Sequence, residues 1–378
     1  MQRDKRINLF KEKGYYVIKE YESIYDSQET KDTRLRWIKN LQEDINSLNI
    51  KYNEKSFFDD IDESDNKTHI YYNEEKVEIY IAKSIQEYVK IIVEAVSDNK
   101  NHIYYRGHSN WKYLLKPSIY RAENENILDN EDKLFRDIIA SKPHFFNQCT
   151  TTLEKLVTMQ HHELPTRLLD LTDNALISLY FACKYKENIH GEVTIFDVPE
   201  DKFKYYDSDT VSVLSNLAKA DIEFDVSDFN FTEYKGSEFF CEMISDTKLR
   251  NKYIDDFNKR EEILQLVHAI REEKPYFSNK IDPSHLFNHT VVVKPKMSID
   301  RIINQSGAFV LFGINATKSE CADLDINSED YKQRIIIIPS AYKKGIIEQL
   351  KLFNINDSTV FGDMDNTAKY FKQKYLNI

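Results

Sequence analysis

The stretch that decides the fold is MQHHELPTRLLDLTDNALISLYFAC, residues 159–183. Its first half contains two adjacent histidines, an arginine and an aspartate, and its second half is a mainly apolar segment. Buried polar groups cost free energy unless they are paired, so their concentration beside an apolar segment indicates the wall of a cleft. We therefore expect residues 176–183 to form a buried helix that holds the polar half in place.

The local residue types subdivide this stretch. Pro165 disfavours a helical conformation for Leu164, so PTRLLDL is expected to begin as a strand or loop. Asp173 or Thr172 is expected to cap the helix that begins near Asn174, with Asp173 favoured.

A second polar cluster, HIYYRGHSNWKYLLKPSIYR, occupies residues 102–121. Gly107 follows a short expected strand, where a glycine allows a close backbone approach to a ligand or a positive φ. Arg106 can form bidentate bonds to a phosphate or a carboxylate, and the Trp111 ring can stack on a flat ligand. The alternative is structural: Arg106 pairs with a carboxylate such as Asp170, and Trp111 belongs to the core.

Other polar groups have candidate roles. His161 or His162 is a candidate general acid or base, or a donor to a ligand, and a purely structural role is equally consistent with the sequence. Gln305 and Gly307 directly precede a strongly apolar strand. Residues 360–365, VFGDMD, are expected to form a turn that caps the final helix.

Composition narrows the class of protein. The chain has 378 residues, 41% of them hydrophobic, and a net charge of −11, which argues against a broad nucleic-acid-binding face. Its apolar runs are too short to span a membrane and its start does not resemble a signal peptide, so we expect a cytoplasmic protein. The four cysteines form no C-x-x-C pair, so we expect free thiols and no metal. Walker, dinucleotide-binding, zinc-protease and α/β-hydrolase motifs are absent.

Mixed α+β is the expected fold class, because strands and helices do not alternate strictly. Residues 1–83 are expected to be an appendage with a helix at 30–48 and a strand at 77–82. The main domain is expected to span residues 84–378, with a mainly helical insertion at about 201–283. Further helices are expected at residues 84–98, 130–146, 151–161, 341–352 and 367–375, and further strands at 102–105, 191–199, 289–294, 308–313 and 334–339.

The motifs resemble those of FRG-domain proteins, a family named for an aromatic-Arg-Gly element. The resemblance runs from about residue 84 to 375, interrupted by the region 201–283. It rests on Tyr105-Arg106-Gly107, Trp111, the P-S-x-x-R element at residues 117–121, the Q-H-x-x-L-P-T-R-L-L-D-x-T element at 160–172, Leu179 to Ala182, and Arg301, Gln305, Gly307 and Phe309. The closing family element departs at Gly362 and Asn366, where the family has Pro and Gly.

A weaker resemblance is to the arginine-class ADP-ribosyltransferases. Their first motif is similar to a strand that ends in Tyr-Arg-Gly, and its arginine holds the diphosphate of NAD. Their third motif has a catalytic glutamate beside a late strand, where this chain has Gln305 and Ala308. A glutamine can hydrogen-bond a ribose hydroxyl but cannot act as a carboxylate base.

These resemblances imply an ADP-ribosyltransferase-like mixed sheet flanked by helices, with NAD as a substrate in a cleft between the two clusters. The expected ligand-binding residues are Tyr105, Arg106, Gly107, Trp111 and Asp170, and the expected catalytic residues are His161, His162, Arg167 and Gln305.

The implied setting is bacterial conflict, as a toxin-like or anti-phage effector. The implied acceptor is a protein or nucleic acid, without a membrane, and residues 1–83 are expected to bind a partner protein or self-associate. Two alternatives stay open: a non-catalytic module that binds a nucleotide or nucleic acid, and a histidine-dependent hydrolase of RNA or NAD.

Overall fold

The computed structural model describes residues 67–72, 75–96, 101–227, 229, 247–278, 280–296, 303–322, 324 and 332–376. The helix expected at residues 30–48, and Arg301, lie outside these residues. In the described part of the chain no helix is both long and apolar enough to cross a membrane.

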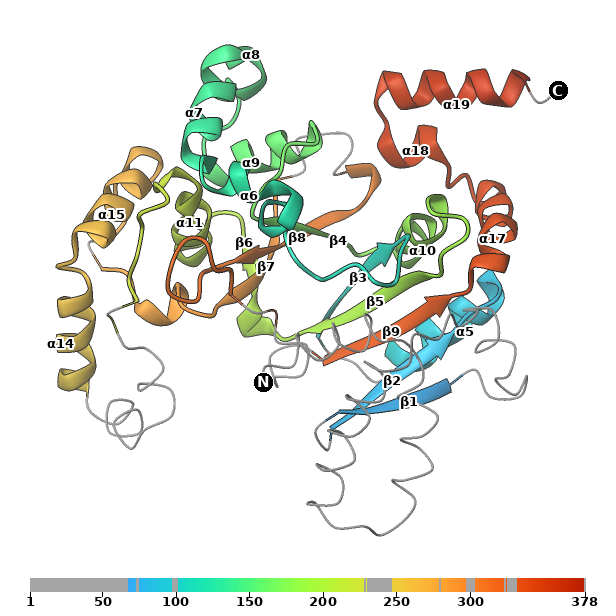
Figure 1. Cartoon of the computed structure of the whole chain (residues 1–378), viewed down its shortest axis with the longest axis horizontal. Coiled ribbons are helices and arrows are strands. Elements are labelled where there is room, and N and C mark those ends of the chain that lie inside the picture. Colours follow the sequence, from blue (N-terminus) through green and yellow to red (C-terminus); the bar gives the residue numbers. More distant parts are fainter. Residues whose placement is uncertain are drawn as a thin grey trace, which may run out of the picture.

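The centre of the molecule is one mixed sheet (Figure 1). Within the described residues its strand order is β1-β2-β9-β5-β3-β4-β8-β7-β6, with parallel pairing for β2–β9 and β6–β7 and antiparallel pairing elsewhere. The strands are β1 Lys67–Tyr72, β2 Glu75–Ile81, β3 His102–His108, β4 Leu168–Thr172, β5 Gly191–Val198, β6 Phe203–Tyr205, β7 Thr290–Lys294, β8 Gly307–Phe312 and β9 Lys332–Ile338.

Helices flank this sheet, so the expected α+β class is confirmed. The described α-helices are α5 Ile85–Val96, α6 Glu125–Leu128, α7 Glu131–Ser141, α8 Pro143–Phe146, α9 Thr152–His161, α10 Ala175–Lys184, α11 Asp209–Asn216, α14 Thr247–Phe257, α15 Glu261–Glu273, α17 Ser340–Leu352, α18 Asp357–Phe361 and α19 Met364–Leu376.

Three local expectations need correction. The strand expected to stop at residue 105 continues to His108. The helix expected at 130–146 is interrupted at Lys142, whose φ of −134° is non-helical because Pro143 follows it. Asn174, not Asp173, caps α10, since its side-chain oxygen accepts hydrogen bonds from the first free amides of that helix.

Two groups of helices cover one face of the sheet (Figure 1). Helices α9, α11 and α15 form an apolar cluster with Leu168 of β4 and Leu311 of β8. Helices α5, α10 and α17 form another with Ile195 of β5. The strand register places Ile195, Tyr105 and Leu168 on the same face, so both helix groups pack on the same side of the sheet.

Strands β3 and β4 diverge from each other. They are paired at a single register position, Tyr105 with Thr172, whereas β3 pairs with β5 along its whole length. The side chain of Arg106, directly beyond the paired position, can therefore reach β4 between the two strands.

Two regions outside the expected core contribute to it. Strand β2 precedes residue 84 and is hydrogen-bonded to β9, so the sheet continues across the expected domain boundary. The described residues of the region expected as an insertion are mainly helical, and they supply Val211, Phe257 and Ile263 to the cluster around α9.

Candidate functional site

A cavity of about 250 Å³ opens where β3 and β4 diverge. Strands β3, β4 and β8, helix α9 and the segment that follows β3 all contribute to its lining. Its principal polar residues are Arg106, Arg121, Gln160, His161, Asp170 and Gln305. Arg106, His161, Asp170 and Gln305 are among the site residues expected from the sequence, and the fold brings these four together.

Arg106 is fixed on two sides. Its Nε donates to His108 Nε2 at 2.7 Å, and its Nη1 donates to the Asp170 carbonyl and lies 3.7 Å from the Asp170 carboxylate. Only 12% of the side chain is exposed, whereas 57% of the Asp170 side chain is. Burial, and to a smaller extent the positive charge of Arg121, lowers the pKa of Arg106 to about 10 despite the opposing effect of Asp170. Arg106 still carries a positive charge at neutral pH.

Arg121 is a second cation at the same cavity. It follows the short 3-10 helix Ser118–Tyr120 and its side chain is exposed. In the part of the chain that the structure describes, no carboxylate forms an ion pair with it. Two arginines that repel each other across a cavity are most stable with an anion between them.

Gln160 orients the carboxylate of Asp170. Its side-chain nitrogen donates to Asp170 Oδ1 at 2.6 Å, and its oxygen accepts from the Thr166 hydroxyl. Asp170 is thus held between Gln160 and Arg106. The pairing of Arg106 with Asp170, considered above as a structural alternative, is confirmed, but the pair lies at a cavity and not in the core.

The C-terminal segment contacts a residue of the cavity lining. Gln305 Nε2 donates to the Val360 carbonyl at 3.3 Å. Asp363 accepts from the Asn366 amide at the start of α19, which confirms the expected capping of the final helix, while residues 360 and 361 form the end of α18 and not part of the turn. Burial raises the pKa of Asp363, but the hydrogen bonds from Asn366 and the nearby charge of His161 outweigh burial, and the net shift is downward.

Two residues at the cavity have left-handed backbone conformations. Glu163, in the lining, has a φ of 64°, and Ser306, between Gln305 and Gly307, has a φ of 48°. Non-glycine residues rarely adopt such values, and strained residues of this kind concentrate at functional sites. Their position supports a binding role for this cavity.

Arg167, expected to be catalytic, lies elsewhere. Its side chain has no exposed surface and donates to both carboxylate oxygens of Glu131 at 2.6–2.9 Å. It also donates to the Tyr120 hydroxyl, and Lys318 lies 3.2 Å from Glu131. The environment of Arg167 is that of a buried structural ion pair, which cannot touch a ligand in this conformation.

Four other expected site residues lie outside the lining of the cavity. Trp111 is 2% exposed and belongs to the core, as the structural alternative predicted. Tyr105 is buried on the face that packs against α10. His162 is exposed, and its ring packs edge-on against Phe145. The close backbone approach at Gly107 is to α10, because a Cβ atom there would lie 1.8 Å from the Ser178 carbonyl oxygen.

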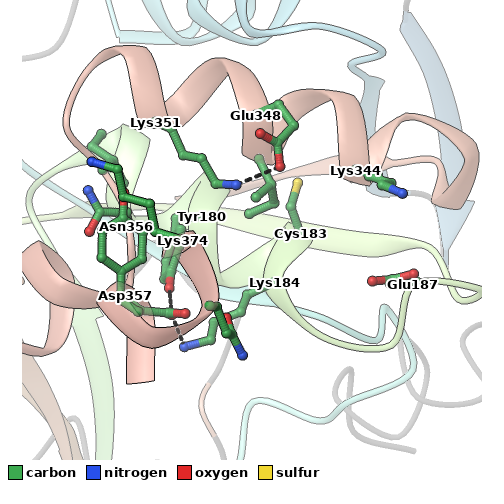
Figure 2. A pocket seen from close by; sticks show the side chains of 14 residues that line it. Tyr180, Cys183, Lys184, Glu187, Lys344, Glu348, Lys351, Asn356, Asp357 and Lys374 are labelled. Carbon is green, nitrogen blue, oxygen red and sulfur yellow. Dashed lines mark hydrogen bonds and ion pairs between the residues drawn. The ribbon is translucent and has the colours of Figure 1, made fainter. Parts of the chain in front are cut away.

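A larger cavity, of about 610 Å³, lies between α10, α17 and the C-terminal helices (Figure 2). There Asp357 forms an ion pair with Lys184 and accepts from the Tyr180 hydroxyl, and Lys351 pairs with Glu348 at 2.6 Å. Of the expected site residues, none lines this cavity.

Residues 101–190 match the FRG domain family. The chain contains an FRG domain. No curated protein and no solved structure matches the chain. The matched region includes five of the six principal polar residues of the smaller cavity, and Gln305 is contributed from outside it.

Sequence reasoning did not select Arg121, Gln160 or Asp363 as site residues. Arg121 and Gln160 stand in the P-S-x-x-R and Q-H elements, so both were visible as polar members of a pattern. Asp363 stands in the closing element at residues 360–365, but no local pattern could place it near His161, which lies in a distant part of the chain.

Proposed function

We propose that the cavity between β3 and β4 binds the phosphate-bearing part of NAD or a related nucleotide, and that the protein is an ADP-ribosyltransferase-like effector. The observation that carries this proposal is the convergence of Arg106 and Arg121 on one cavity. Arg106 is held in place, and Arg121 has no carboxylate partner among the described residues. Guanidinium groups in this arrangement suit a phosphate or diphosphate.

The volume of the cavity limits what it encloses. Small-molecule sites commonly measure about 300–1,000 Å³, and this one measures about 250 Å³. It suits a phosphorylated ribose, with the remainder of a dinucleotide extending outside. In this arrangement Gln305 and His161, both in the lining, are placed to hydrogen-bond ribose hydroxyls.

Transfer of an ADP-ribosyl group breaks the bond between nicotinamide and ribose, releases nicotinamide and forms a bond from the ribose to the acceptor. Positive charge develops on the ribose in this step, and a carboxylate stabilises it. The expected late-strand glutamate is replaced by Gln305. The carboxylates in the lining are instead Asp170, engaged by Gln160 and Arg106, and the exposed Glu163. We propose Glu163 as the carboxylate that is available for this role, with His161 as a proton acceptor for the incoming group.

A non-catalytic nucleotide-binding module is the second candidate. It is favoured by Gln305, whose amide donates to the Val360 carbonyl and which has no negative charge to contribute. A hydrolase that uses both histidines receives less support, because His161 lines the cavity and His162 does not.

Incubation of the full chain with labelled NAD and a bacterial cell extract separates the candidates. A transferase is expected to label an acceptor or release nicotinamide, and Arg106→Ala and Glu163→Gln are expected to reduce the rate by about 100-fold or more. Arg250→Ala, at an exposed ion pair with Asp282, is the matched control. If the protein binds NAD but shows no turnover in any extract, the non-catalytic module is the supported candidate. If it shows neither NAD binding nor turnover, the proposal is rejected.

The proposed biological setting, a toxin-like or anti-phage effector, has its own test. Expression of the wild-type chain in bacteria is expected to slow growth or to restrict phage infection. Arg106→Ala should abolish either effect at equal protein levels. An effect of equal size in both would show that it does not depend on this cavity.

A further inference from the structure

Arg106 belongs to a row of polar side chains that crosses the two neighbouring strands β3 and β5. Alternate residues of a strand point to the same face, so Arg106 and His108 share one face of β3. The antiparallel register places Thr194 of β5 opposite Arg106, and Glu192 opposite His108. These four polar side chains share the face whose other core residues are aliphatic and aromatic.

The row is connected by contacts from one end to the other. The Thr194 hydroxyl donates to Glu192 Oε1 at 3.2 Å. Glu192 Oε1 lies 3.8 Å from His108 Nδ1, and His108 Nε2 accepts from Arg106 Nε at 2.7 Å. The imidazole of His108 is therefore hydrogen-bonded to the arginine at the cavity and makes a longer, electrostatic contact with Glu192 on its other side.

The two middle members of the row are buried. The Glu192 side chain is 1% exposed and the His108 side chain 4%. Burial of a carboxylate is costly, and apolar side chains of similar volume would fill the same space without that cost. The proposed role of Arg106 gives a reason for retaining the pair, because a ligand-binding guanidinium must be held in one orientation.

The geometry also determines where the His108 proton lies. A guanidinium only donates hydrogen bonds, so His108 Nε2 must accept with a free lone pair. A neutral ring then carries its proton on Nδ1, on the side of Glu192. The carboxylate stabilises this tautomer, and the tautomer supplies the acceptor that Arg106 requires.

We infer that His108 and Glu192 are positioning residues that hold the Arg106 guanidinium with its Nη2 group directed to the ligand. Nε is occupied by His108 and Nη1 by Asp170. In the described part of the chain Nη2 makes no hydrogen bond, so its two donors remain for a phosphate. This inference depends on the proposed function in one respect only, namely which ligand Arg106 binds.

The first test is independent of any ligand. ¹⁵N NMR of histidine-labelled full chain near neutral pH is expected to show His108 as the neutral Nδ1–H tautomer. Glu192→Gln, which removes the negative charge, is expected to shift the ring towards the Nε2–H form. A wild-type His108 that is an imidazolium, or the Nε2–H tautomer, overturns the inference.

The second test measures NAD affinity by calorimetry. His108→Leu removes the acceptor and is expected to weaken binding about tenfold or more, whereas His108→Gln keeps an acceptor and should stay within about threefold of wild type. Ser178→Ala, which removes a buried hydrogen bond to Tyr88, is the control and should bind as wild type does. Equal affinities of the leucine and glutamine variants contradict a positioning role.

The two tests separate this inference from the proposed function. If the wild type shows the Nδ1–H tautomer but does not bind NAD, the proposed ligand is wrong and the positioning row stands. If the wild type binds NAD but His108 is the Nε2–H tautomer, the positioning role of His108 and Glu192 is wrong and the proposed ligand stands.

Discussion

Arg106 and Arg167 both stand in polar clusters of the sequence, but the fold gives them different surroundings. Arg167 is fully buried against Glu131, a partner 36 residues earlier in the chain. Arg106 keeps part of its guanidinium at a cavity. The sequence identifies both arginines as candidates for anion binding. Only the structure shows that the hydrogen bonds of Arg167 are used within the protein, whereas Arg106 can still bind a ligand.

Removal of Arg167 should therefore lower stability and spare the site. Arg167→Met leaves Glu131 buried with one cation, Lys318, and should lower the free energy of unfolding by about 3–5 kcal/mol. Urea unfolding measures this change. Arg136→Met, at an exposed position of α7, should change stability by less than about 1 kcal/mol, because its ion pair with Asp132 is made by a largely exposed side chain. If Arg167→Met folds with wild-type stability but no longer binds NAD, Arg167 belongs to the binding site after all.

At the scale of elements, α10 is packed unusually close to the sheet. Gly107 of β3 and Gly191 of β5 both face it, and a Cβ atom at Gly191 would lie 2.2 Å from the Ala182 carbonyl oxygen. This contact explains why a glycine follows Arg106. The sequence indicated a special glycine, and the elements that meet there were not visible in it.

Gly107→Ala is expected to displace α10 from β3, since neither backbone can yield to the added methyl group. The cost in unfolding free energy should be about 3 kcal/mol or more, measured by thermal or urea unfolding. Gly345→Ala, in α17 with nothing within 4 Å of the added atom, is the matched control and should stabilise the protein by about 0.5–1 kcal/mol. A neutral Gly107→Ala would contradict the close packing.

Helix α17 is joined to the loops beside it by one buried lysine. Lys343 Nζ donates to the carbonyls of Ser109, Tyr185, Lys186 and Ile189 at 2.7–3.1 Å, and its side chain has no exposed surface. The Ser109 carbonyl lies directly after the end of β3, and the other three carbonyls lie in the connection from α10 to β5. A single side chain therefore ties three segments together.

Lys343→Met should leave these carbonyls without their donor and lower the free energy of unfolding by about 2–4 kcal/mol. The neighbouring Lys344 is exposed, and Lys344→Met is expected to be near neutral. Urea titrations of both variants provide the comparison. Equal stability of the two would show that the ammonium contributes no net free energy.

For the whole molecule, hydrophobic periodicity predicted most of the described strands and helices. Alternation predicted β2. Ser84, with Glu87 three positions later, is a capping pattern that marks the start of α5, where the Ser84 side chain accepts from the Glu87 amide. Such patterns are local. The order of the strands, the single pairing between β3 and β4 and the approach of the C-terminal segment to His161 depend on contacts between distant segments, and no local pattern encodes them.

The site was predictable to the same extent. Arg106, His161, Asp170 and Gln305 were expected from three separate stretches and meet at one cavity. Arg167, Trp111 and Tyr105 were also expected there and are buried elsewhere. A cluster of polar and aromatic residues in a sequence therefore contains both residues that line a site and residues that support it. The burial of each side chain in the structure shows to which group it belongs.

The central claim is that Arg106 and Arg121 together form a nucleotide phosphate site. Calorimetric titration of the full chain with NAD tests it most directly. We predict saturable binding of one NAD per chain, weakened by about 1.5–3 kcal/mol in Arg106→Ala and in Arg121→Ala and unchanged in Arg250→Ala. No binding to the wild type, or equal binding by all four proteins, would contradict the claim.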